Sequence, residues 1–399
     1  FMLQPEVLTK ELAIVPFFRL AFRPFFLLPA LLSIVCLLAW LAILNGAIVW
    51  QGSIAVNNWH GHEMIFGFAA SVVIGFLLTA AQTWTGVRGI HSWKLAILVL
   101  CWLIARIAFV TNDPSILITG VIAELSWWLI SIGYLSYMII KSNNRKNLVF
   151  IPLLMLLAML DTTIMSTAIT NNVALASHLS YVAIFMITAV VTILGGRVIP
   201  FFTTRALNLP VISPNALIER AVAATMILTI VNFTISYWVN NTSVLSILFI
   251  ITGISQILRI MNWSTLKTFK TPLLWSLHFA YLNMGIGYIT LGSSYFFKVI
   301  SFSSALHIIT LGTIGTMILS MMSRVSLGHT ARALQSNIWV NLSFAALLMA
   351  TWLRFIMPIF NFHHSAYLLA GIGWTLGFGI FLIYYTPILL KARSDGRSG

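Results

Sequence analysis

Long apolar runs separated by short polar segments follow one another along the whole chain. A transmembrane helix needs about 20 consecutive, mostly apolar residues to cross the hydrocarbon core of a bilayer. Because many of these runs reach that length, the pattern predicts an all-α polytopic membrane protein with about twelve transmembrane helices. The predicted spans are 25–45, 62–83, 93–110, 115–140, 148–168, 174–196, 217–238, 243–260, 272–291, 302–323, 337–356 and 364–390.

The first run is expected to be a span and not a cleaved signal peptide. Arg19 and Arg23 precede it, no small-residue cleavage site follows it, and the next apolar run begins soon afterwards. We expect residues 1–399 to form a single integral membrane domain.

Composition agrees with a membrane protein. Apolar residues make up 60% of the 399 positions, charged residues only 8%, and the mean hydropathy is +0.98. These values lie outside the usual range of soluble domains, which could not bury so much apolar surface. Membrane lipid is therefore the expected surroundings of the chain.

The cations lie mainly at alternate ends of the predicted spans. In a soluble protein the net charge of +14 would suggest nucleic acid as a partner. Here the alternation follows the positive-inside rule, so we expect no nucleic acid and place both termini in the cytoplasm. The cations on that side are Lys10, Arg19, Arg23, Arg88, Lys94, Lys141, Arg145, Lys146, Arg197, Arg205, Arg220, Arg259, Lys267, Lys270, Arg324, Arg332, Lys391, Arg393 and Arg397.

Two of the cationic loops resemble each other. Arg197-Val-Ile-Pro-Phe-Phe-Thr-Thr-Arg205-Ala-Leu follows span 6, and Arg324-Val-Ser-Leu-Gly-His-Thr-Ala-Arg332-Ala-Leu follows span 10. The loop around Arg88 after span 2 is a weaker third copy. The chain is therefore predicted to contain three parallel repeats of four spans around a pseudo-threefold axis along the membrane normal. Their approximate bounds are 20–142, 146–264 and 268–391.

A histidine lies at a similar distance upstream of each of these loops. His62, His178 and His307 each stand near the predicted outer start of the second helix of a repeat. Three helices that bring imidazole to one level could provide a haem or copper site. His60 would point about 200° away from His62 on a regular helix. The two are then not expected to share a metal, and both could instead be interfacial histidines in headgroup water.

Acidic residues inside spans are functional candidates by default. Glu63 could orient a ligating histidine or deliver protons, or it could pair with Arg106 or Arg354. Asp161 and Glu124 could belong to a proton relay, or they could bond nearby Ser, Thr or Trp side chains.

The other candidates have two interpretations each. His278 could bind a cofactor or hydrogen-bond between helices, and His329 could bind copper, a haem propionate or nothing. Arg197 and Arg324 could clamp propionates or act as membrane anchors. No Walker loop, dinucleotide fingerprint or Cys-x-x-Cys-His occurs, so any haem would be held non-covalently. The two cysteines are expected to be packed thiols.

Several motifs make the chain similar to the NnrS family. They run through nearly its whole length: Pro16-Phe-Phe-Arg-Leu-Ala-Phe-Arg-Pro-Phe-Phe26, Trp59-His-Gly-His-Glu-Met-Ile-Phe-Gly-Phe68, Gly75-Phe-Leu-Leu-Thr-Ala80, Gly195-Gly-Arg-Val-Ile-Pro-Phe-Phe-Thr203 and Arg324-Val-Ser-Leu-Gly-His-Thr330. The resemblance implies a twelve-span protein of the bacterial cytoplasmic membrane that contains haem and copper and is linked to nitric oxide metabolism and nitrosative stress. Two positions depart from the family pattern, with Gly61 and Ala331 standing where the family usually has Ala and Gly.

A looser similarity connects the chain with the catalytic subunit of haem-copper oxidases and nitric oxide reductases. That subunit also has twelve spans and haem-ligating histidines in spans 2 and 10. Span 7 of this chain contains no histidine, so the three-histidine metal site of that family cannot be assembled in the usual way.

The sequence thus predicts a haem b protein, with copper as a second metal, that acts on nitric oxide or a related small molecule. The protein would bind nitric oxide, reduce it in the manner of a nitric oxide reductase with Glu63 as a catalytic residue, or transfer electrons from an unknown donor. One alternative is a proton-coupled transporter or metal exporter that uses the same histidines, and another is an assembly or sensing factor.

Overall fold

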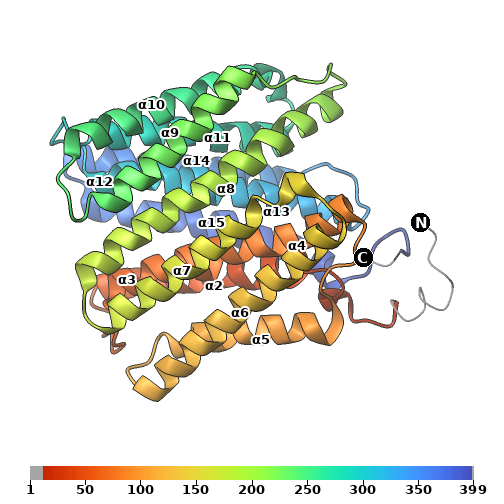
Figure 1. Ribbon diagram of the computed structural model, residues 1–399, viewed down its shortest axis with the longest axis horizontal. Coiled ribbons are helices and arrows are strands. Elements are labelled where there is room, and N and C mark those ends of the chain that lie inside the picture. The colour runs from red at the N-terminus through yellow and green to blue at the C-terminus, as the bar shows by residue number, and fades with distance from the viewer. Residues whose placement is uncertain (1–11, 398–399) are drawn as a thin grey trace. The chain divides into compact units, whose positions relative to one another are not determined.

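The computed structural model describes residues 12–397, all of whose regular elements are helices (Figure 1). Lys10 of the predicted cytoplasmic cations lies outside this range. The elements are η1 (Pro16–Phe18), α2 (Phe22–Leu44), α3 (Val56–His62), η2 (Glu63–Ala70), α4 (Ser71–Thr85), α5 (Ser92–Ala108), α6 (Pro114–Lys141), η3 (Arg145–Asn147), α7 (Phe150–Ile169), α8 (Val173–Leu207), α9 (Ala216–Ile235), α10 (Thr242–Met261), η4 (Thr265–Thr268), α11 (Pro272–Ser293), α12 (Phe302–His307), η5 (Ile308–Gly315), α13 (Thr316–His329), α14 (Ile338–Ile356), η6 (Met357–Phe360) and α15 (His363–Leu390).

Every predicted span coincides with a helix, and the all-α, multi-pass membrane prediction is confirmed. Within the described residues, 10 helices are long and apolar enough to cross a bilayer. Helices α5, with 17 residues, and α11, with 22, are not among them. The count of twelve spans, the threefold repeat and the cytoplasmic termini stay predictions.

Polar residues in the short loops begin several helices. The side chain of Asp113 accepts hydrogen bonds from the backbone of Ser115 (2.8 Å) and Ile116 (3.2 Å), with Pro114 as the first residue of α6. Asn337 accepts one from the backbone of Val340 (2.9 Å) at the start of α14. These side chains satisfy backbone donors that a helix start leaves without an intrahelical partner.

The described chain divides into two compact units. The first contains residues 12–183, 322–334 and 381–397, and the second contains residues 184–321 and 335–380. In the first unit α5 and α6 lie side by side, and α2 packs on η2 and α4 (Figure 1). In the second, α10 packs between α9 and α11, and η5 lies against α11 and α14.

Helices α10 and α11 of the second unit approach closely at two glycines. A Cβ on Gly253 would overlap the carbonyl oxygen of Gly285, and a Cβ on Gly285 would lie 3.0 Å from the carbonyl oxygen of Gly253. Small residues at such a crossing allow helix backbones in a membrane to pack without intervening side chains.

Two predicted spans contain a π-helix, a rare geometry that often marks functional sites. In span 2 the π-helix η2 begins directly after His62, and in span 10 the π-helix η5 begins directly after His307. The residue directly after each π-helix donates a side-chain hydrogen bond to the backbone carbonyl five residues before it. Ser71 donates to the carbonyl of Phe66 at 2.8 Å. Thr316 donates to the carbonyl of Leu311 at 3.1 Å. The histidine regions of spans 2 and 10 are therefore locally alike.

Candidate functional site

Five ionisable side chains form a buried cluster in the first unit. They are His62 at the end of α3, Glu63 at the start of η2, Arg106 on α5, Glu124 on α6 and Asp161 on α7, and none is more than 5% exposed. Charged side chains inside membrane helices are costly and are usually paired. The contacts within this cluster show how each of them is paired.

His62 lies between two carboxylates. Its Nδ1 is 3.2 Å from Oε1 of Glu63, and its Nε2 is 2.7 Å from Oδ1 of Asp161. The second oxygen of Asp161 accepts a hydrogen bond from Nε1 of Trp128 at 2.7 Å. Ionised carboxylates only accept hydrogen bonds, so either the imidazole carries protons on both nitrogens or one of the acids carries a proton.

Arg106 connects Glu63 to Glu124. Its Nη1 donates to both oxygens of Glu63 at 3.1 Å, and its Nη2 forms a close ion pair with Glu124. The guanidinium also lies over the ring of Phe109, 5.3 Å from the centroid. Of the two arginines that the sequence offered to Glu63, Arg106 is thus its partner.

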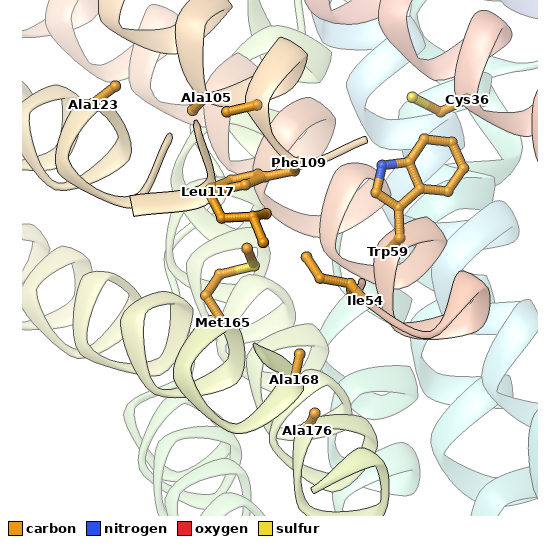
Figure 2. Close-up of a cluster of buried hydrophobic side chains, with 11 residues drawn as sticks. Cys36, Ile54, Trp59, Ala105, Phe109, Leu117, Ala123, Met165, Ala168 and Ala176 are labelled. Atoms are coloured by element: carbon orange, nitrogen blue, oxygen red, sulfur yellow. The ribbon is translucent and has the colours of Figure 1, made fainter. Parts of the chain in front are cut away.

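Apolar side chains cover this cluster. Phe109 places its ring edge-on to His62, with the centroids 5.2 Å apart, and belongs to a buried hydrophobic cluster that also includes Leu117 and Met165. Figure 2 shows these three side chains close to one another between their helices. Cys36, in the same cluster, is a buried free thiol and Cys101 is also free, as the sequence predicted. The apolar cover keeps the dielectric around the charges low.

The cluster has one more acidic group than it has cationic groups. With His62 as an imidazolium, it and Arg106 supply two positive charges against three carboxylates. An unbalanced buried charge is unfavourable, and one additional proton would make the cluster neutral. The arrangement is therefore suited to hold a proton and exchange it.

His60 lies outside this cluster. Its ring stacks on Trp40 with the centroids 4.6 Å apart, and its Nδ1 is buried without a hydrogen-bond partner in residues 12–397. His60 and His62 thus have different neighbours, as their spacing predicted. His178 is half-buried on α8, next to Ser177, whose hydroxyl donates to Asn58 of α3 at 2.8 Å.

The remaining candidate histidines have varied surroundings. Nδ1 of His307, in the second unit, lies 2.6 Å from the carbonyl oxygen of Ser303. The fully buried His278 bridges two threonine hydroxyls, with Nε2 2.9 Å from Thr203 and Nδ1 2.9 Å from Thr265. In the first unit the ring of His329 lies 5.6 Å from that of Phe22 and its carbonyl accepts from Arg393 at 3.1 Å. Among the residues that the structure describes, no group of three or more His, Cys, Asp or Glu side chains is arranged to hold a metal ion.

The second unit contains a buried polar cluster that the sequence analysis missed. Arg259 of α10 forms a close ion pair with Glu219 of α9, and its Nη1 donates to the hydroxyl of Tyr281 and the carbonyl of Thr192, both at 2.8 Å. A Cβ on Gly196 would overlap the guanidinium, so this glycine of the Gly-Gly-Arg motif leaves space for the arginine. Arg259 is one of the predicted cytoplasmic cations, and its place inside an apolar run is the only sequence signal of its buried role.

The two predicted arginine clamps belong to different units. Arg197 and Arg205 line a cavity of about 930 Å³ at the C-terminal end of α8, together with Pro200, Asn208 and Trp263. Arg324, on α13, is buried and 6% exposed, in the first unit.

A comparison with protein families finds one that covers most of the chain. The family described as NnrS protein matches residues 16–393. A search of curated proteins finds no match to this chain.

Proposed function

Since the chain belongs to the NnrS family, we propose that it is a membrane haem b protein that acts on nitric oxide. Membership of this family suggests a role in the response to nitric oxide. Our proposal adds that histidines hold the haem without a covalent bond, and that the protein binds nitric oxide, reduces it or transfers electrons to it. Copper is a second candidate metal.

A haem ligand must offer an imidazole nitrogen that carries a lone pair. His60 meets this condition, because its Nδ1 is buried and has no hydrogen-bond partner among the described residues, while its ring stacks on Trp40. The buried Nδ1 of His60, which no described residue hydrogen-bonds, is the main support for the proposal. In a neutral His307, donation from Nδ1 to the carbonyl of Ser303 places the lone pair on Nε2, an orientation typical of ligating histidines.

Two of the candidate histidines fit this role poorly. Both ring nitrogens of His62 are hydrogen-bonded to carboxylates, and both of His278 are hydrogen-bonded to threonines. We therefore assign haem ligation in the first unit to His60 and, independently, in the second unit to His307. His178 and His329 stay candidates for a metal.

Haem bound by these residues would supply an iron that binds nitric oxide and exchanges electrons. Reduction of nitric oxide also consumes protons, and the chain's own groups can hold them. His62 keeps its protons between Glu63 and Asp161, and Arg106 limits the net charge of the cluster. We assign proton storage to this cluster, with Glu63 positioning His62.

Absorption spectroscopy of the purified protein tests the proposal. We expect a Soret band and a pyridine haemochrome in the natural chain, and a lower haem content in His60→Ala and in His307→Ala. His363→Ala is the matched control, since His363 is exposed, and should retain full haem. His62→Gln should also retain haem and change only the rate of reaction with nitric oxide. A natural chain with neither haem nor metal would refute the proposal, as would full haem in both ligand variants.

The buried cluster also favours a second candidate function, a proton-coupled transporter. A site that holds three acids, an arginine and a histidine in apolar surroundings is typical of proton relays in membrane transporters. Ion flux in liposomes that persists without haem and is lost in Asp161→Asn would support this alternative over haem chemistry.

A further inference from the structure

Three arginines share one position in their helices. Arg106 of α5, Arg259 of α10 and Arg354 of α14 each lie two residues before the last helical residue. All three are buried, with exposed fractions of 5%, 7% and 5%. They differ in what compensates their charge.

Among the residues that the structure describes, the first two arginines have carboxylate partners and the third has none. Arg106 pairs with two glutamates and Arg259 with one. Within the described part of the chain, the hydrogen-bond partners of Arg354 are two serine hydroxyls, with Nη1 3.5 Å from Ser304 and Nη2 3.4 Å from Ser303.

These contacts leave most of the guanidinium's bonding capacity unused. Distances of 3.4–3.5 Å lie at the long limit of hydrogen bonds, and a guanidinium has five N–H donors. The ring of Tyr367, 4.6 Å from Cζ of Arg354, provides a cation–π contact but no negative charge. A buried cation without a counter-ion is unfavourable, so this site as described lacks an anion.

A comparison with the first unit shows where the counter-charge is missing. There the residue directly after His62 is Glu63, which pairs with the arginine of the neighbouring helix α5. In the second unit the residue directly after His307 is Ile308. The π-helix follows in both cases, so the two regions share a backbone pattern and differ in the internal carboxylate.

We propose that Arg354, together with Ser303 and Ser304, binds an anionic group that comes from outside the chain, either a carboxylate or a small oxyanion. Charge-assisted hydrogen bonds from a guanidinium suit both. A carboxylate could be supplied by a propionate of haem held at His307, whose Nδ1 bonds the carbonyl of Ser303, and this source rests on the proposed function. A free oxyanion of the size of nitrite is the other source and does not depend on haem.

Arg354→Met in the full-length purified protein tests this site. In anion-poor buffer the variant should unfold at a higher temperature than the natural chain, because it removes an uncompensated buried charge. Arg106→Met is the matched control and should unfold at a lower temperature, since it leaves two glutamates without their cation. Nitrite should stabilise the natural chain and should bind Arg354→Met about 10- to 100-fold more weakly.

The source of the anion follows from repeating the nitrite titration with haem-containing and haem-free protein. Stabilisation of both forms identifies a free oxyanion. Stabilisation of the haem-free form alone, with less haem retained by Arg354→Met, identifies a haem carboxylate. A natural chain that lacks haem altogether refutes the proposed function. The nitrite titration then decides alone whether Arg354 binds an anion. If Arg354→Met is destabilised and changes neither nitrite binding nor haem content, the arginine has a packing role and the proposal is wrong.

Discussion

Replacing Arg106 by methionine tests whether the buried cluster of the first unit is held by charge. Methionine keeps an unbranched apolar stem of similar length and removes the guanidinium that joins Glu63 to Glu124. Both carboxylates then stay in an apolar environment without their cation. We expect Arg106→Met to destabilise the protein strongly.

The expected magnitude follows from the contacts. At an effective dielectric constant of about 20, two unit charges about 4 Å apart attract by about 4 kcal/mol, and Arg106 takes part in two such pairs. The variant no longer has to desolvate a guanidinium, which offsets part of the loss. Removing one partner of a buried ion pair typically costs about 3–5 kcal/mol, and we expect a decrease in this range.

The assay is unfolding of the purified protein by SDS in mixed micelles. The double variant Arg106→Met/Glu124→Gln should recover about 1–3 kcal/mol relative to the sum of the single changes, because it removes one of the two uncompensated charges. Arg220→Met, at an exposed arginine of α9, is the control and should change stability by less than about 0.5 kcal/mol. An Arg106→Met variant as stable as this control, or a double variant without coupling, would refute the reasoning.

Three further predictions concern packing around the sites. Gly67→Ala should lower stability by about 1–3 kcal/mol, because its Cβ would lie 2.7 Å from Nη1 of Arg106. Gly61→Ala should raise stability by about 0.5–1 kcal/mol, because a Cβ there has nothing within 4 Å. Thermal unfolding of the two variants measures both effects. Gly253→Ala should separate α10 from α11 and lower the unfolding midpoint, because the new Cβ would meet a backbone carbonyl that cannot rotate away. His278→Ala should cost about 2–4 kcal/mol, because it leaves a cavity at a fully buried position and removes one hydrogen bond each from Thr203 and Thr265, while the haem content measured by pyridine haemochrome stays unchanged.

The helices could be predicted from the sequence because hydrocarbon thickness and backbone hydrogen bonding together dictate long apolar segments. Two predicted spans, α5 and α11, are not among the helices that are long and apolar enough to cross a bilayer, which shows the limit of a prediction from length and hydropathy. Helix α5 is shorter than a typical span, and α11 has buried polar positions such as Ser276, His278 and Asn283. Hydropathy measures a side chain's average preference, so it cannot distinguish a polar residue buried against other helices from one that faces water.

The acids of the charged cluster were visible in the sequence, and so was Arg106 as one of two partners offered to Glu63, but the contact between His62 and Asp161 was not. Glu63, Glu124 and Asp161 attracted attention as acids within apolar runs. That His62 meets Asp161 depends on how α7 packs against the first helices of the chain, and the sequence alone does not specify this. The pairing of Arg259 with Glu219 was missed for the same reason, because a cation near a helix end also satisfies the positive-inside rule.

The π-helices after His62 and His307 were not predicted from the sequence, because both segments lie within apolar runs that are equally compatible with a regular α-helix. Because the two regions share this backbone pattern, the difference between Glu63 and Ile308 at the matching position is informative. In the first unit Glu63 neutralises a helix-end arginine from within the chain, and in the second unit Ile308 cannot. If both regions served only to hold the fold together, the second would be expected to contain a carboxylate or to dispense with its arginine. A buried arginine whose partners in the described part of the chain include no carboxylate is better explained by an anion that arrives from outside the chain.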